Sequence, residues 1–272
     1  MENRDVYIVS AVRTAIGKFG GTLASQTAAD MGVVAAKAAI ERADEMYYLL
    51  ADAASGAWIE GLHPDARSLH SHYKSGRVRA EIYDEIVEEI LAPVREGRRV
   101  CAAFYGHPGI FSYLGHESVR RARAEGFAAT MLPAISAADC LFADLGVDPG
   151  VEGLQTYEAT DFLLYRRSVE TTAALVLWQV TAIGEQRAVT EPNREGLRAL
   201  TERLLELYPD DHVVSLYEAS PYPIADPIIR QTALSALGDA DVSPLATLYV
   251  PPLRPPRADP DVSARLGLSG SD

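Results

Sequence analysis

The sequence is poor in several residue types, and each shortage excludes a class of protein. Only two cysteines occur in 272 residues, Cys101 and Cys140, which is too few for a disulfide-stapled secreted fold. No apolar run approaches the length of a membrane-spanning helix, and the N-terminal MENRDVYIVS lacks the pattern of a signal peptide. We therefore expect a cytoplasmic protein with two buried thiols and no membrane partner.

Basic residues are also scarce. Lysine and arginine number 25 against 38 aspartates and glutamates, which gives a formal net charge of −13 and argues against nucleic acid as a main partner. The six histidines show no metal-ligand spacing: His70 and His72 are close together, but no second ligand pair accompanies them, so we predict no metal. The 48% hydrophobic content is enough for a large core in one domain or two.

Apolar runs alternate with helical patterns along the chain, which predicts an α/β protein. A helix is expected over 79–95, because Ile82, Ile86 and Ile90 recur on one face and acidic residues occupy the other. A polar loop is expected over 63–77. Buried strands are expected at residues 6–12, 46–50, 100–104, 175–180, 212–217 and 247–250. The alternation predicts two α/β subdomains, residues 1–132 and 133–252, followed by a tail at 253–272 that begins in a run of prolines.

The chain is organised around residues 100–149. The expected strand at 100–104 runs into Tyr105-Gly106-His107-Pro108-Gly109, a turn whose glycines let another group approach the backbone closely. A second loop, residues 134–139, opens a helix with the capping pattern of Ser136 and Asp139. Loops at the carboxyl ends of parallel strands form the ligand crevice of open α/β sheets. The spacing alone fits either a ligand site or a plain strand-to-helix turn.

The combination of YGHPGIF, MLPAISAADCLFADLGVDPG, QTYEA and LVLWQ resembles the tetrapyrrole-methylase superfamily, and most closely its borosin branch, over about residues 36–265. The resemblance implies two α/β subdomains with S-adenosylmethionine (SAM) in the cleft between them. Ala134 departs from the family, which usually has glycine at this position. The cofactor-binding residues implied by the resemblance are Tyr105, Gly106, His107, Phe111, Ser136, Ala137 and Gln179.

Borosin enzymes methylate backbone amide nitrogens of a peptide, which is difficult because the nitrogen lone pair is delocalised into the carbonyl group. The reaction needs a base and a cationic or hydrogen-bonding group that stabilises an imidate oxygen. Taken singly, Tyr73 fits a loop tyrosine, Arg79 a solvated charge and Tyr83 a core-edge aromatic. The resemblance instead implies that Tyr73 is the base, that Arg79 and Tyr83 stabilise the imidate, and that Tyr105 positions the amide.

The resemblance also implies partners. Fungal borosins carry their core peptide at their own C-terminus, whereas this sequence ends at Asp272. It therefore resembles the split bacterial type, which methylates a separate precursor peptide in trans. The family also implies a homodimer. The alternatives are a small-molecule SAM methyltransferase nearer to the tetrapyrrole enzymes and an inactive hybrid that acts only as a binding protein.

The N-terminal segment departs from the methylase pattern. Residues 5–43 resemble the start of a thiolase, and they replace the short glycine turn that usually follows the first strand of the methylases. Nothing thiolase-like follows, so a coenzyme A reaction is the weakest alternative. The segment still offers a strand, a loop and a helix in the order that the sheet requires, with a capping box at Thr27 and Asp30.

Overall fold

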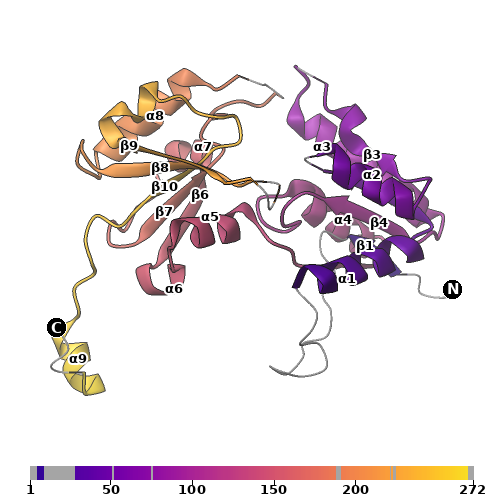
Figure 1. Ribbon diagram of the computed structural model, residues 1–272, viewed down its shortest axis with the longest axis horizontal. Helices are drawn as coiled ribbons and strands as arrows, with labels where there is room; N and C mark the ends of the chain where they lie inside the picture. The colour runs from indigo at the N-terminus through magenta and orange to yellow at the C-terminus, as the bar shows by residue number, and fades with distance from the viewer. Residues whose placement is uncertain are drawn as a thin grey trace. The chain divides into compact units, whose positions relative to one another are not determined.

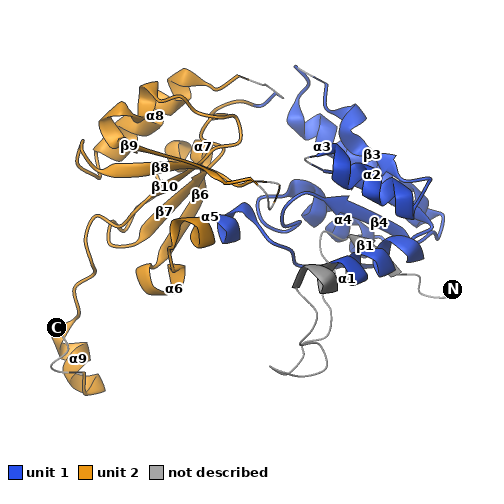
Figure 2. Ribbon diagram, viewed as in Figure 1, with its two compact units in different colours: residues 1–140, 186–189 blue, residues 141–185, 190–272 orange. Residues whose placement is uncertain are grey.

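The computed structural model describes residues 5–8, 28–50, 52–74, 76–187, 191–220, 222 and 225–268, without the side chains of residues 5–8, 28–32 and 35. The chain divides into two compact units (Figure 2). Unit 1 comprises residues 1–140 and 186–189, and unit 2 comprises residues 141–185 and 190–272. Each unit is built on its own sheet of five described strands.

Unit 1 is a parallel α/β structure (Figure 1). Its strands are β1 (Asp5–Ile8), β2 (Glu45–Leu49), β3 (Arg67–Ser68), β4 (Val100–Phe104) and β5 (Ala128–Met131), in the order β3-β2-β4-β1-β5. Its helices are α1 (Ala28–Arg42), α2 (Ala53–Leu62), α3 (Arg79–Arg95) and α4 (Tyr113–Ala124), with the 3-10 turn η1 (Leu69–His72) ahead of α3. Successive parallel strands need such crossover connections.

The two faces of this sheet are covered by different helices. Along β2, Tyr47 and Leu49 belong to the same core cluster as α3 and α4, whereas Met46 and Tyr48 pack with Ile40 of α1 and Ile59 of α2. This alternation follows from the two-residue period of a strand. The predicted apolar face of α3 is confirmed, because its three isoleucines are fully buried.

The thiolase-like segment supplies a strand inside the sheet. β1 pairs in parallel with β4, where Tyr7 lies opposite Cys101, and with β5, where Tyr7 lies opposite Thr130. The segment thus completes the sheet, as its strand-loop-helix pattern predicts. The predicted glycine loop and the cap residue Thr27 lie outside the described residues.

Unit 2 has a mixed sheet. Only β6 and β7 are parallel, and the other neighbouring strands are antiparallel, in the order β6-β7-β10-β8-β9. Its strands are β6 (Leu154–Glu158), β7 (Ala174–Trp178), β8 (Val213–Glu218), β9 (Ile228–Ala233) and β10 (Thr247–Val250). Its helical elements are α6 (Pro149–Glu152), α7 (Ala159–Leu164), α8 (Arg194–Leu205), η2 (Leu234–Asp239) and α9 (Pro260–Leu266), and α5 (Ala137–Leu145) contains the boundary between the units.

The predicted α/β class is confirmed, and three details of the prediction are wrong. The expected polar loop at 63–77 contains β3 and η1, and its Leu69 is fully buried. The expected tail contains α9, which begins at Pro260 after its N-cap Asp259, whose carboxylate accepts hydrogen bonds from two backbone amides. The exposed edge strand β9 was not expected, since its two consecutive isoleucines break the alternation that marks a strand.

Candidate active site

The four predicted catalytic residues all belong to unit 1. Tyr73 follows η1, Arg79 and Tyr83 lie in the first turns of α3, and Tyr105 directly follows β4. The Tyr105 amide donates a hydrogen bond to the Leu49 carbonyl over 2.9 Å, which extends the pairing of β2 and β4. Carboxyl ends of parallel strands meet at one edge of a sheet, and the loops that follow β3 and β4 therefore bring these residues together.

Three tyrosine rings form a row. The ring centroids of Tyr73 and Tyr83 lie 6.4 Å apart with the planes tilted by 60°. Tyr83 also stacks on Tyr113 of α4, with 5.7 Å between centroids and 24° between planes. Tyr113 was absent from the residues predicted from sequence, because nothing in the sequence places α4 beside the start of α3.

A segment distant in sequence fixes the start of α3. The Arg79 amide donates to the Gln186 carbonyl over 2.9 Å, and the Arg79 Nε donates to the Arg187 carbonyl over 3.2 Å. Arg187 in turn donates to the Gly76 carbonyl over 2.5 Å and forms a β-bridge with Val78. These contacts hold the predicted catalytic arginine through both its backbone and its side chain.

The phenol groups of this cluster interact electrostatically. Desolvation raises the pKa of Tyr73 well above the ordinary value of 10.0, the neighbouring Tyr83 and Tyr105 add to the rise, and the Arg79 guanidinium opposes it. Desolvation likewise raises the pKa of Tyr105, where Tyr83 again adds to the rise and Arg79 opposes it. Arg79 is therefore the group in the cluster that favours a phenolate.

A histidine clamps the loop before Tyr73 onto α3. The His72 Nε2 lies 2.6 Å from a Glu89 carboxylate oxygen, and its Nδ1 lies 3.3 Å from Glu85. Glu85 also accepts two hydrogen bonds from Arg77, at 2.9 and 2.6 Å. Hydrogen bonds from Arg77 and His72 lower the pKa of Glu85 to about 2. The clamp lets Tyr73 face Tyr83 although it lies outside any helix.

The predicted turn after β4 is closely packed. Gly106 has φ of +70°, and the His107 Nδ1 accepts a hydrogen bond from the Gly109 amide over 2.9 Å, which leaves Nε2 as the ring donor. A Cβ atom on Gly115 of α4 would lie 2.2 Å from the Pro108 carbonyl oxygen. The first turn of α4 therefore touches the loop backbone directly, and only glycine permits that approach.

The second predicted loop lies beside the first. The Ser136 amide and hydroxyl each donate to one Asp139 carboxylate oxygen over 2.6 Å, and the Asp139 amide donates back to the hydroxyl over 3.3 Å. The reciprocal cap predicted at the start of α5, just before Ala137, is thus present. Hydrogen bonds from Ser136 lower the pKa of Asp139, and nearby His107 contributes to the same shift.

The loops after β4 and β5 present apolar side chains together with polar backbone groups. A ligand such as SAM, with an adenosine and an amino-acid end, needs both kinds of contact. Tyr105 is 62% exposed, Phe111 53% and Ile135 69%, and Phe111 is held at a φ of +52°. Exposed apolar side chains that gather at one edge of a sheet offer a binding surface. In their chemistry, the residues present are compatible with SAM. Gln179, the remaining predicted cofactor residue, follows β7 in unit 2 with a φ of +55°.

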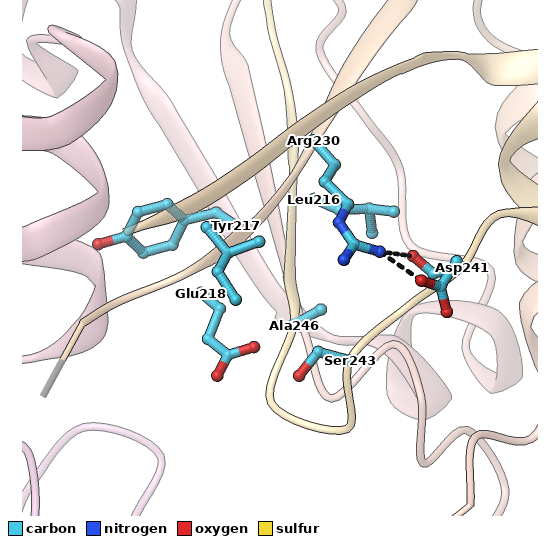
Figure 3. A pocket seen from close by; sticks show the side chains of 8 residues that line it. Leu216, Tyr217, Glu218, Arg230, Asp241, Ser243 and Ala246 are labelled. Atoms are coloured by element: carbon cyan, nitrogen blue, oxygen red, sulfur yellow. Dashed lines mark hydrogen bonds and ion pairs between the residues drawn. The ribbon is translucent and has the colours of Figure 1, made fainter. Parts of the chain in front are cut away.

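Two other pockets differ greatly in size. A pocket of about 430 Å³ in unit 1 is lined by residues that include Tyr48, Asp52, Glu60 and His70, and so lies close in sequence to Tyr73. In unit 2, a pocket of about 10 Å³ holds little more than one water molecule beside the Arg230–Asp241 ion pair (Figure 3). Within the described parts of the chain, no group of three or more potential ligands can hold a metal ion, and no helix is long and apolar enough to cross a membrane.

Comparisons with known proteins show which family the chain belongs to. The model of the tetrapyrrole (corrin/porphyrin) methylases matches residues 33–221. The chain is 36% identical over 238 residues to a methyltransferase/ribosomally synthesized cyclic peptide gymnopeptides precursor of Gymnopus fusipes, covering 86% of this chain and 57% of that protein. It is 35% identical over 234 residues to the corresponding omphalotin A precursor of Omphalotus olearius, covering 84% of this chain and 56% of that protein. The chain thus spans a little over half the length of these relatives.

The fold has a counterpart among solved structures. Uroporphyrin-III-C-methyltransferase from Thermus thermophilus matches with a TM-score of 0.52 and 20% identity, over 80% of this chain and 86% of that one. The resemblance inferred from the sequence motifs is confirmed. The family match begins at residue 33, so the thiolase-like strand lies outside it. The chain belongs to the tetrapyrrole (corrin/porphyrin) methylases, a family of SAM-dependent methyltransferases.

Proposed function

We propose that the protein transfers methyl groups from SAM to backbone amide nitrogens of a ribosomal precursor peptide. The observation that carries the proposal is the cluster of Tyr73, Arg79, Tyr83 and Tyr105 at one edge of unit 1. The relatives described above, whose names join a methyltransferase to a cyclic peptide precursor, support the same substrate class.

The proposed roles follow from the chemistry of an amide. Tyr73 removes the amide proton as a phenolate, and Arg79 favours that phenolate without itself titrating. The negative charge that develops on the amide oxygen is stabilised by Arg79 and by the hydroxyl of Tyr83. Tyr105 holds the amide in line. Methyl transfer would form the nitrogen–carbon bond while the carbon–sulfur bond of SAM breaks and the demethylated thioether leaves; the proton stays on Tyr73.

The two loops after β4 and β5 hold the cofactor in this proposal. Gly106 and Ser136 offer backbone groups, the His107 Nε2 donates a hydrogen bond, and Phe111 packs on the adenine. Ala137 and Gln179 complete the set. SAM, when bound, supplies an electrophilic methyl group on a positively charged sulfonium. That positive charge would add to the effect of Arg79 and lower the pKa of Tyr73.

We propose that the acceptor peptide is a separate chain. The proposed homodimer and the cytoplasmic location stay predictions. Light scattering at several protein concentrations tests the dimer.

The first experiment is calorimetric titration of the purified protein with SAM and with its demethylated product. Saturable binding supports the cofactor assignment, and a folded protein without binding would instead be a binding protein with a methylase fold. Mass spectrometry then follows candidate precursor peptides, a tetrapyrrole acceptor and the protein itself after incubation with SAM. Mass increases of 14 Da on a peptide backbone support the proposal, increases on the enzyme indicate an acceptor in cis, and methylation of the tetrapyrrole alone overturns it.

A further inference from the structure

Tyr113 touches the proposed active site from α4. It is the first residue of α4, and its ring is 46% exposed. The ring stacks on Tyr83 with 5.7 Å between centroids. Its hydroxyl donates a hydrogen bond to the Asp84 carboxylate over 3.2 Å. Tyr113 is therefore attached to α3 at two adjacent residues, one through its ring and one through its hydroxyl.

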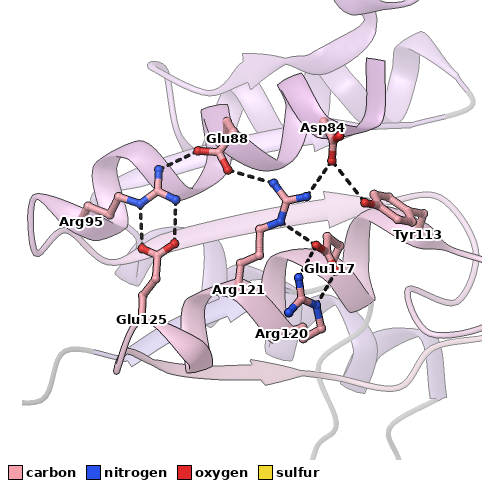
Figure 4. A network of polar contacts seen from close by, with 8 residues as sticks. All are labelled: Asp84, Glu88, Arg95, Tyr113, Glu117, Arg120, Arg121 and Glu125. Carbon is pink, nitrogen blue, oxygen red and sulfur yellow. Dashed lines mark hydrogen bonds and ion pairs between the residues drawn. The ribbon is translucent and has the colours of Figure 1, made fainter. Parts of the chain in front are cut away.

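Arginines hold the carboxylates of α3 in place around this contact (Figure 4). Arg121, two turns along α4 from Tyr113, donates to Asp84 over 2.7 Å and to Glu88 over 2.9 Å. Its Nε donates to Glu117 over 2.6 Å, so the guanidinium is fixed from its own helix as well. The Asp84 carboxylate that receives the Tyr113 hydroxyl is thus already oriented.

We propose that Tyr113 is a positioning residue, which fixes the ring of Tyr83 beside Tyr73 through stacking and is itself held by Asp84 and Arg121. This inference rests on the proposed function of Tyr83. A stacked ring limits rotation of its neighbour to geometries that keep the two faces together. A displacement of about 1 Å at a reacting group lowers a rate by as much as about a hundredfold, so such a constraint matters for the chemical step.

The surroundings favour positioning over a contribution to stability. The Asp84 and Glu88 side chains are about half exposed, and ion pairs between exposed groups contribute little to folding because water screens them. The network contributes little to stability, but it orients Asp84, Arg121 and Glu117 around Tyr113. It is therefore suited to hold the Tyr113 ring in place. Tyr83 itself is half-buried and packs against the core of unit 1.

The test compares Tyr113→Leu with Tyr113→Phe. The leucine variant removes stacking and hydrogen bond, and we expect kcat for peptide methylation to fall about tenfold while KM for SAM stays within about twofold. The phenylalanine variant keeps the stacking, and we expect it to recover most of the rate. Arg120→Gln is the matched control, because Arg120 pairs only with Glu117 among the contacts drawn in this network, and its rate should be unchanged.

A second readout does not depend on activity. Fluorotyrosine placed at position 83 reports the ring environment by fluorine NMR, and its signal should shift and broaden in Tyr113→Leu but stay close to wild type in Tyr113→Phe and in Arg120→Gln. A wild-type protein that methylates no peptide would overturn the proposed function, while the fluorine signal would still test the contact. An unchanged signal and unchanged kcat in Tyr113→Leu would overturn the positioning role.

Discussion

The two sheets of this molecule differ in how they present side chains. In unit 1 every described strand runs parallel, so successive loops emerge at one edge, and the loops after β3 and β4 place three tyrosines and an arginine together there. In unit 2 most neighbouring strands are antiparallel, and its edge strand β9 is largely exposed. In a parallel sheet, the loops that follow the strands lie at one edge and bring together residues that are far apart in sequence. In an antiparallel sheet, successive loops alternate between the two edges.

The difference also appears in how polar groups are satisfied. Around α3 and α4 of unit 1, carboxylates and arginines form a connected network. In unit 2, the ion pairs of Arg198 with Asp239 and of Arg230 with Asp241 lie apart on exposed surface. The connected network fixes the orientation of side chains on α3 and α4 of unit 1. Equivalent substitutions in the two units should therefore differ in their effect on activity.

The largest expected effect is that of Tyr73→Phe. Loss of the proposed base should lower the rate of peptide methylation by about 10²- to 10⁴-fold while SAM affinity, measured by calorimetry, stays unchanged. Single-turnover mass spectrometry measures the rate. A variant that retains the wild-type rate would remove Tyr73 from the chemistry.

The matched substitution in unit 2 is Tyr208→Phe. The Tyr208 hydroxyl is buried and has no hydrogen-bond partner among the described residues. Removing an unsatisfied buried hydroxyl should leave methylation unchanged and raise the free energy of unfolding by about 1 kcal/mol. Urea unfolding checks this, and a large loss of activity would show that unit 2 also carries reacting groups.

The pH dependence of the reaction is the second expected effect. The pKa of Tyr73 is raised by desolvation and by its tyrosine neighbours, so its phenol is protonated at neutral pH and loses its proton as the pH rises. If Tyr73 is the base, kcat/KM should rise by about tenfold per pH unit below that pKa, because the phenolate fraction does so. Arg79→Ala should shift the rise to higher pH. A profile that is flat between pH 7 and 9 would contradict the assignment.

The third effect concerns stability. Gly115→Ala would place a methyl group against the Pro108 carbonyl oxygen and should destabilise unit 1 by about 1–3 kcal/mol through forced displacement of the loop. Gly61→Ala in α2 is the control, because no described atom beyond its chain neighbours and its own helix backbone lies within 4 Å of the added carbon. That control should stabilise the helix by about 0.5–1 kcal/mol. Equal midpoints of thermal unfolding for the two variants would refute the close approach of α4 to the loop.

The smallest effect is expected in acid. Hydrogen bonds from Arg120 and Arg121 lower the pKa of Glu117 to about 2, from an ordinary value of 4.5. Because the folded pKa is depressed, the stabilisation is present above pH 4.5 and is lost as the pH falls toward 2. Glu117→Gln should reduce this part of the pH dependence slightly, since Arg120 is largely exposed and water screens its pairing with Glu117. Urea midpoints measured from pH 6 down to pH 3 would show it.

Local signals predicted most of the fold. The period of its isoleucines predicts α3 from Arg79 to Arg95, and the apolar run from Val100 to Phe104 predicts β4 with the observed bounds. Asn193, a residue type that favours helix N-caps, caps α8, and its side chain accepts a hydrogen bond from the Gly196 amide. β3 was missed because two residues at the edge of a sheet carry no periodicity, although they fix the position of the loop before Tyr73.

The site was only partly accessible from sequence. The motif resemblance named Tyr73, Arg79, Tyr83 and Tyr105, and their common place at the sheet edge agrees with it, although their catalytic roles stay predictions. Contacts across helices were not accessible, because no spacing rule brings Tyr113 to Tyr83. The bridge of His72 to two glutamates was equally hidden, since it joins a loop to a helix face.

The position of β1 has a consequence for how the chain folds. This strand is synthesised before the other described strands of its sheet, yet its hydrogen-bonding neighbours β4 and β5 follow roughly a hundred residues later, and contacts of such long sequence separation form slowly. Until β4 and β5 emerge from the ribosome, β1 has no neighbouring strands to pair with. Because backbone groups line the position of β1, that position accepts a thiolase-like segment with the right pattern of strand and helix. The edge of unit 1 that carries the proposed site therefore depends on a strand that joins the sheet only after the strands on either side of it have been made.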